Sequence, residues 1–168
     1  PPSSRRQRQM CIRDRYMDEK NGGFKGAPKF PQLYIFDTIF YFYNKNKKNT
    51  FLDVVRKLLN NISSKGIYDH LGGGISRYTV DEKWIVPHFE KMLYDNILFV
   101  RTVNNYLVNQ QEKKLNDKLI QTINFINNEF LNDKNLLGSA YDADSEGIEG
   151  KYYVWSAEEI KELLGNDI

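Results

Sequence analysis

The chain has 168 residues, and its 24 Lys and Arg against 22 Asp and Glu give a formal net charge of +2. Five arginines lie within residues 1–15 beside a single acid, so the rest of the chain carries a small excess of acids. This distribution argues against a nucleic-acid-binding domain, which carries its positive charge on a folded face. No apolar stretch reaches the ~20 residues of a membrane helix, so neither a nucleic acid nor a membrane is an expected partner.

The first fifteen residues differ from the rest of the chain in composition. Residues 1–15 read PPSSRRQRQMCIRDR, without apolar periodicity, whereas the remainder is rich in Asn, Lys and Ile. One interpretation is a basic arm for nucleic acid or membrane. The string resembles translated sequencing adapter, as at the ends of metagenomic gene fragments, so we interpret it as a non-native, disordered segment and residues 16–168 as the domain.

The number of cysteines indicates the cellular compartment and which kinds of site the chain can form. The only cysteine, Cys11, lies in that excluded segment, so neither a disulfide framework nor a Cys-based zinc site is expected. We therefore expect a cytoplasmic protein that uses no cofactor and no metal.

The first predicted helices lie between residues 33 and 62. Residues 33–43 are apolar almost all round, which predicts a helix buried on most sides. From Phe51 to Ile62, apolar residues recur at helical spacing and predict an amphipathic helix. Gly66 stands where a glycine commonly ends a helix.

Residues 66–88 form a long glycine-rich loop, GIYDHLGGGISRYTVDEKWIVPH. Residues 76–80 and 83–86 could pair as a hairpin across Asp81-Glu82. Pro87 suits a helix start, and helical spacing continues from Phe89 to Leu107. The run Gly72 to Gly74 lacks the Lys and Ser/Thr of a phosphate-binding loop, so we interpret it as a tight turn or a close backbone approach.

A further helix is predicted from Leu115 to Phe130, followed by a second glycine-punctuated loop at residues 136–155 with strand-like ends at 138–141 and 151–155. Ser156 and Glu159 form a capping box for a last helix. Five helices result, in two antiparallel pairs plus one. Loops of about twenty residues are uncommon and usually functional. The repeat of helix pair and long loop indicates a helical-hairpin array that needs neighbours to bury its apolar faces.

Both histidines lie in or beside the first long loop, each with an acid nearby. Asp69 precedes His70, and Glu90 follows His88 by two residues. The functional interpretation is a pair of acid/base groups, each oriented by a carboxylate. The alternative is structural: His70 braces a loop and His88 caps a helix.

The second long loop carries Asp142, Asp144 and Glu146 before Gly147, like the first half of a calcium loop. Position twelve is Tyr153 in place of the bidentate Glu, so carboxylates at the mouth of a site are the better interpretation. Flat aromatic side chains beside carboxylates suit a sugar, although such rings also cap helix layers. The nominated catalytic residues are His70, His88, Glu90 and Asp142; the nominated substrate-binding residues are Asp69, Arg77, Trp84, Tyr94, Asp95, Tyr141 and Asp144.

Three segments carry a family resemblance: GGFKGAPKFP (22–31), GIYDHLGGGISRYTVDEKWIVPHFEKMLYDN (66–96) and SAYDADSEGIEGKYYVW (139–155). They resemble the thioredoxin-domain-containing, spermatogenesis-associated family. This resemblance implies an N-terminal thioredoxin-like domain, absent here, followed by a six-hairpin α/α toroid similar to glycosidases and N-acylglucosamine 2-epimerases. The fold class is therefore expected to be mainly α, an incomplete toroid with short β-hairpins in its long loops.

The resemblance assigns no catalytic residue to this chain, because the catalytic sets of the related enzymes do not align onto it by motif. The leading hypothesis is a carbohydrate-binding toroid that epimerises, isomerises or hydrolyses a sugar by acid/base catalysis. The rival is a non-catalytic helical scaffold serving a thioredoxin-like redox domain. The expected partners are a small sugar, that missing domain and the remaining toroid helices.

Overall fold

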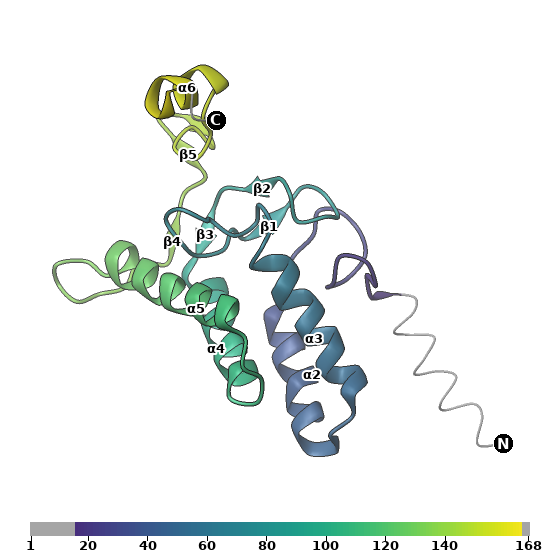
Figure 1. Ribbon diagram of the computed structural model, residues 1–168. Coiled ribbons are helices and arrows are strands. Elements are labelled where there is room, and N and C mark those ends of the chain that lie inside the picture. Colours follow the sequence, from purple (N-terminus) through teal and green to yellow (C-terminus); the bar gives the residue numbers. More distant parts are fainter. Residues whose placement is uncertain (1–15, 166–168) are drawn as a thin grey trace.

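The computed structural model describes residues 16–165, and two antiparallel helix pairs form its body (Figure 1). The first pair is α2 (Leu33–Asn46) and α3 (Asn49–Ile62). The second is α4 (Leu93–Leu107) and α5 (Lys113–Phe125), which runs on into a π-helix (Ile126–Phe130). Helices α2 and α4 pack against each other, so the two pairs share one core. Residues 1–15, which we interpret as a non-native segment, lie outside the described part of the chain.

Helix α3 confirms the amphipathic pattern, because Leu52, Val55, Leu58, Leu59 and Ile62 are all buried. Helix α2 corrects an expectation. It buries Leu33, Phe36 and Phe40 but leaves Tyr34, Tyr41 and Phe42 exposed. Apolar residues occupy every face of α2, but only one face is buried, since no described element covers the outer face.

The first long loop folds differently from the predicted hairpin. Strand β1 (Tyr78–Thr79) pairs with β2 (Pro87–His88), placing Tyr78 opposite His88. The side chain of Asp81 accepts hydrogen bonds from the amides of Lys83, Ile85 and Val86, which makes residues 80–86 a closed loop instead of a two-residue turn. The prediction that Pro87 begins a helix is wrong, because Pro87 lies in a strand.

Two further strand pairs organise the second loop. Strand β3 (Lys91–Met92) pairs with β4 (Ala140–Tyr141), which delays the start of α4 to Leu93. Strands β5 (Asp144–Ser145) and β6 (Ile148–Glu149) form a hairpin whose central residues, Glu146 and Gly147, both have positive φ. Such a turn matches the twist of a two-residue hairpin. The expected strand at residues 151–155 is absent: residues 151–153 form a turn, and residues 154–155 are irregular.

Helix α6 (Ala157–Leu164) begins at the predicted capping box, in which Ser156 and Glu159 each accept the other's backbone amide. None of its residues is buried. In Figure 1 it stands beyond β5, away from the two helix pairs. The helix is therefore held by its cap and its own backbone more than by tertiary packing.

Two glycine positions explain how the loops fit against the helices. A Cβ at Gly66 would lie 2.0 Å from the carbonyl oxygen of Ile85, so the backbone passes there too closely for any side chain. This corrects the expected helix-ending role of Gly66, since the cap of α3 is Ser63. Gly74, with φ 81°, would place a Cβ 2.6 Å from the ring of Phe125. The close-approach interpretation of the glycine run is thus confirmed.

Within residues 16–165, no helix is long and apolar enough to span a membrane. The five described α-helices, separated by short β-hairpins, agree with the fold class expected from the sequence.

Candidate functional site

A cavity of about 350 Å³ lies where the two long loops meet the end of α5. Residues from both glycine-rich loops and from the π-helix line it, so it joins segments far apart in the sequence. The lining is formed by Asp69, Gly72, Lys91, Phe125, Glu129, Tyr141, Asp142, Asp144, Ser145, Tyr152 and Tyr153, and we call this space the loop pocket.

A buried ion pair forms the floor of the loop pocket. The Lys91 side chain is 2% exposed, and its Nζ donates to Asp69 Oδ2 at 2.7 Å and to the carbonyl oxygen of Gly73 at 3.0 Å. Burial lowers the pKa of Lys91, against the opposing effect of Asp69. Burial alone would raise the pKa of Asp69, but the hydrogen bond and charge of Lys91, with the amides of Gly72 and Leu71, hold that pKa below its usual value. The ion pair therefore favours the charged form of Asp69, whereas for Lys91 the net effect of burial opposes the charge that Asp69 supports.

Aromatic rings surround this ammonium group. Lys91 Nζ lies 4.4 Å from the ring centroid of Phe125 and 4.9 Å from that of Tyr153. Burial, followed by the negative charge of Asp69, raises the pKa of Tyr153 to about 12. The Tyr153 ring is also stacked on Phe89, with centroids 5.3 Å apart, which fixes this wall of the pocket.

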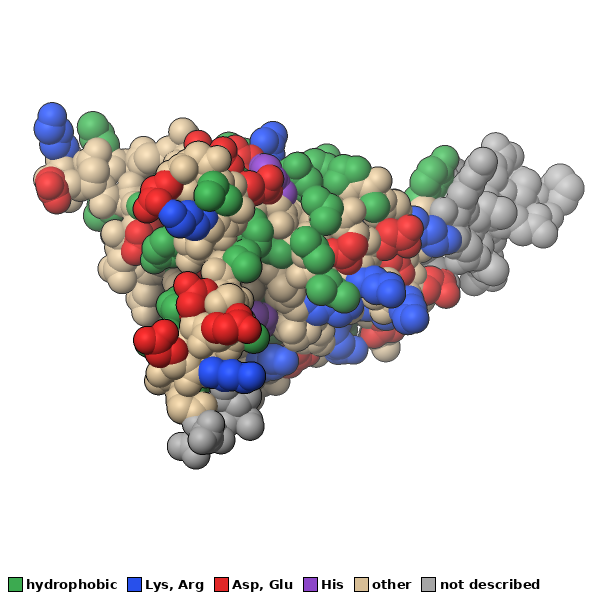
Figure 2. Space-filling model, turned by 90° about the horizontal axis from the view of Figure 1, so that it is seen from above, with side chains coloured by type: hydrophobic (Ala, Val, Ile, Leu, Met, Phe, Trp, Pro, Cys, Tyr) green, Lys and Arg blue, Asp and Glu red, His purple; other side chains and the backbone are tan. Residues whose placement is uncertain are grey.

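The π-helix contributes an acid, Glu129, to the lining of the loop pocket. Tyr141 donates from its hydroxyl to the backbone carbonyl of Glu129 at 2.6 Å. A π-helical turn at the end of α5 re-aims the side chains that follow, and such turns recur at functional sites. Asp142 comes from the β4–β5 connection, and Asp144 is the first residue of β5. Figure 2 looks down onto this end of the molecule and shows acidic and apolar side chains interspersed on the same face.

A second polar cluster lies at the start of α4. Arg77 donates to the Glu90 carboxylate at 2.8 Å. Burial raises the pKa of Asp95 to about 6, against the lowering effect of Arg77 and Tyr94. Asp95 Oδ2 and Arg77 Nε are buried and without a hydrogen-bond partner in the described chain. Four nominated residues therefore meet outside the lining of the loop pocket: Arg77, Glu90, Tyr94 and Asp95.

The two histidines do not converge. His88 Nδ1 lies 2.7 Å from Glu149 Oε1, and its ring is stacked on Tyr78 with centroids 4.7 Å apart. His70 is exposed, and its Nε2 lies 3.0 Å from the carbonyl oxygen of Lys65. His88 therefore has a carboxylate partner, although not the expected Glu90, whereas His70 braces the loop.

Trp84 is a core residue. Its side chain is fully buried, its indole nitrogen donates to the carbonyl oxygen of Asn21 at 2.9 Å, and the ammonium of Lys29 lies 4.9 Å from its ring. Because Trp84 has no exposed surface, it cannot contact a substrate, and its nomination as a substrate-binding residue was wrong.

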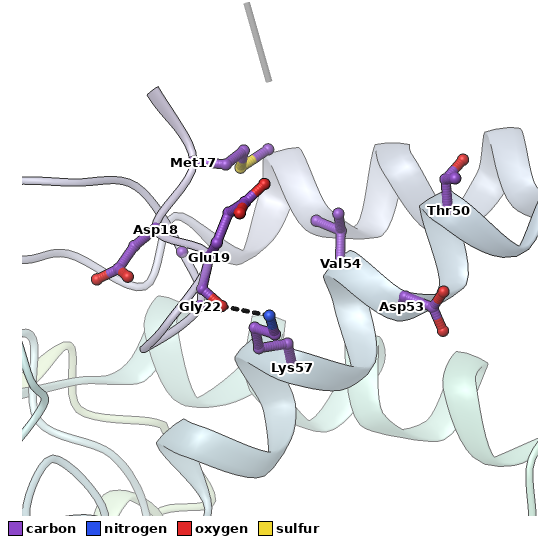
Figure 3. A pocket seen from close by; sticks show the side chains of 9 residues that line it. Met17, Asp18, Glu19, Gly22, Thr50, Asp53, Val54 and Lys57 are labelled. Carbon is purple, nitrogen blue, oxygen red and sulfur yellow. Dashed lines mark hydrogen bonds between the residues drawn. The ribbon is translucent and has the colours of Figure 1, made fainter. Parts of the chain in front are cut away.

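A smaller cavity of about 240 Å³ opens between residues 17–23 and α3 (Figure 3). Lys57 donates across it to the backbone carbonyl of Glu19. Beside it, Asp18 pairs with Lys29; burial opposes ionisation of Asp18, but hydrogen bonds from Asn21 and Lys29 lower its pKa to about 2. None of the nominated residues lines this cavity, so it is not the leading site.

Four of the nominated residues line the loop pocket: Asp69, Tyr141, Asp142 and Asp144. The sequence did not nominate Lys91, Glu129 and Tyr153 of the same lining, nor Glu149, the partner of His88. Lys91 looked like an ordinary surface lysine in an apparent helix, and only the β3–β4 pairing turns it inward. Among the described residues, no group of three or more His, Cys, Asp or Glu could hold a metal ion.

The amino-acid sequence of the chain is similar to those of known proteins. No family model matches the chain. It is 33% identical over 163 residues to an uncharacterised protein of Caenorhabditis elegans, and 31% identical over 176 residues to human spermatogenesis-associated protein 20. These matches cover 89% and 98% of this chain but 22% of each relative. The chain thus spans about a fifth of the length of the curated relatives it matches.

Solved structures identify the architecture. A sugar epimerase from a ruminal bacterium matches with a TM-score of 0.66 at 17% identity, covering 82% of this chain and 41% of the other. The cellobiose 2-epimerase of Bacillus thermoamylovorans matches with a TM-score of 0.65 at 18% identity, covering 84% and 40%. At such identities the likeness concerns the fold. The chain has the fold of part of an α/α toroid of the sugar epimerase type, as the sequence predicted.

Proposed function

We propose that the chain forms part of a carbohydrate-binding toroid and that the loop pocket binds a sugar. One observation carries the proposal: four nominated residues, Asp69, Tyr141, Asp142 and Asp144, converge on one cavity together with a buried lysine. A sugar presents hydroxyls to carboxylates and C–H faces to aromatic rings, and this lining offers both. The fold shared with sugar epimerases supports the same conclusion.

The lining also suggests a division of roles. Lys91 and Asp69 hold each other in place and form a rigid polar floor, whereas Asp142 lies at the mouth, where it can accept or return a proton. Outside this lining, His88 with Glu149 forms a second acid/base pair, because a carboxylate on Nδ1 leaves Nε2 as the base. Epimerisation next to a carbonyl needs such a base, so we propose a sugar epimerase or isomerase ahead of a glycosidase.

Binding is tested by titrating glucose, mannose and cellobiose into the chain and following heat or tyrosine fluorescence. We expect saturable binding that Asp142→Ala weakens about tenfold, because a charge-assisted hydrogen bond is lost. Asp133→Ala is the matched control, since Asp133 is exposed and absent from the lining. Saturable binding that both substitutions leave unchanged would place the sugar elsewhere.

The second candidate is a helical scaffold for a thioredoxin-like domain, which the exposed apolar side chains of α6 favour. The two proposals separate in a full-length relative assayed for binding and turnover of a panel of sugars. Turnover that falls in His88→Ala supports catalysis by the toroid. Unchanged turnover removes His88 from the mechanism, and the absence of any sugar binding leaves the scaffold as the remaining proposal.

A further inference from the structure

The loop pocket has an uneven charge. Its lining contains four carboxylates, Asp69, Glu129, Asp142 and Asp144, and a single ammonium, that of Lys91. This ammonium group already donates hydrogen bonds to Asp69 and to the carbonyl oxygen of Gly73. The Lys91–Asp69 pair cancels its own charge, so the remaining three acids set the field in the pocket.

The remaining acids lie at the mouth, where an entering ligand meets them first. All three are exposed: Glu129 lies on the π-helix, Asp142 on the β4–β5 connection and Asp144 at the start of β5. Charges that line one cavity act together on a ligand well inside the Debye length of about 8 Å at physiological salt. The raised pKa of Tyr141, caused by burial and then by Glu129, agrees with a negative field. An anionic ligand would therefore be repelled and a cationic one attracted.

Aromatic rings in the same lining are suited to a cation. Phe125 and Tyr153 already flank the ammonium of Lys91. Tyr152 lies edge-on to Tyr153, with centroids 5.1 Å apart, and is 74% exposed, so a free ring face remains at the mouth. A ring face beside carboxylates attracts an ammonium group by cation–π and charge interactions together.

We propose that the loop pocket selects protonated amino sugars, accepts neutral sugars more weakly and excludes sugar acids and sugar phosphates. This selectivity rests on the proposed function, because it presumes that a sugar occupies the loop pocket. Hydroxyl groups bind at the polar floor, and the ammonium group of the sugar lies among Glu129, Asp142 and Asp144. The side chain of Lys91, being neutralised by Asp69, does not attract a phosphate.

The test compares glucosamine, N-acetylglucosamine, glucose and glucuronate with the full chain by calorimetry at about pH 6.5, where an amine of this kind is protonated. We expect glucosamine to bind about tenfold more tightly than N-acetylglucosamine, and glucuronate more weakly than glucose. In about 1 M salt, the preference for glucosamine should fall below about threefold, because exposed charges are then screened.

Variants locate the source of the selectivity. Asp142→Asn combined with Asp144→Asn should remove most of the preference for glucosamine. The amide oxygen introduced by Asp142→Asn can still accept the hydrogen bond from the backbone amide of residue 144, so the local backbone is kept. Asp117→Asn on α5 is the matched control, because Asp117 is exposed and outside the lining. It removes the same kind of charge and should leave the preference intact.

Each outcome decides between the two proposals. Equal binding of all four sugars overturns the charge selectivity and leaves sugar binding standing. A preference that survives in the double variant also overturns it, since the acids at the mouth are then not its source. Failure of every sugar to bind overturns both proposals together.

Discussion

At the scale of single residues, Asp95 is a carboxyl group placed where burial opposes its charge. One of its oxygens is buried without a hydrogen-bond partner, and its pKa is raised to about 6. An unfolded aspartate ionises near pH 3.9. Between these values the unfolded state releases its proton first, so the free energy of unfolding falls as pH rises from about 4 to about 6 and levels off above.

Asp95→Asn should remove this pH-dependent loss. The difference between the folded and unfolded pKa values corresponds to about 3 kcal/mol, and partial solvent access reduces the expected effect to about 2 kcal/mol. Urea unfolding of the variant and of wild type at about pH 4 and about pH 7.5 measures this effect. The free energy of unfolding of the variant minus that of wild type should be about 2 kcal/mol larger at the higher pH. An equal difference at both pH values would contradict the assignment, and the exposed Asp117→Asn should show no such trend.

The Lys91–Asp69 pair gives a second prediction at this scale. Asp69→Asn keeps an oxygen for the amides of Leu71 and Gly72 but leaves a buried ammonium without its counter-charge. We expect the free energy of unfolding to fall by about 3 kcal/mol. Adding Lys91→Met removes the uncompensated charge, so the double variant should be more stable than Asp69→Asn alone. Urea denaturation decides this; a double variant less stable than the single one would show that packing, not charge, governs the site.

At the scale of elements, the β5–β6 hairpin meets the body at Phe89, in addition to the contact between Glu149 and His88. Gly147 and Gly150 both have positive φ, yet a Cβ at Gly147 meets nothing within 4 Å, whereas one at Gly150 lies 2.5 Å from the Phe89 ring. That ring stacks on Tyr153 of the loop pocket. Gly150 therefore links the hairpin to the wall of the pocket.

The two glycines form a matched pair of variants. Gly147→Ala should cost about 1 kcal/mol, from backbone strain alone. Gly150→Ala should cost about 1–3 kcal/mol more, because the Phe89 ring must move. Hydrogen exchange at the amide of residue 150, which donates to the Ala143 carbonyl, should speed up far more in Gly150→Ala. Similar exchange rates in both variants would mean that the hairpin is not held by this contact.

At the scale of the whole molecule, α6 exposes an apolar side. Leu163 and Leu164 are 66% and 63% exposed, and Trp155 just before the helix is half exposed. Adjacent exposed apolar side chains promote association. Leu163→Lys with Leu164→Lys should therefore reduce self-association of the chain in analytical ultracentrifugation, while Glu162→Gln on the same helix should not. Identical association in all three proteins would point to another surface, such as the exposed rings of α2.

Particular residues show how far the sequence could go. Helical periodicity identified α3 and the capping box identified α6, because both signals are local and depend on neighbours three or four positions apart. Composition and spacing also nominated Asp142 and Asp144, and both line the loop pocket. The helix start predicted at Pro87 was wrong, because pairing with β1 overrides a weak local preference. The strand predicted at residues 151–155 was also wrong, since no described strand pairs with them.

The sequence by itself determined the helices, their pairing and the concentration of acids and aromatic rings in two glycine-rich loops. Only the tertiary structure decided which of these side chains meet. Lys91 is buried on Asp69 because β3 pairs with the distant strand β4, which places Lys91 opposite Tyr141 and turns its ammonium inward. Trp84 is in the core and the histidines lie apart for the same reason: burial and pairing are set by distant neighbours, whose identity no local pattern contains.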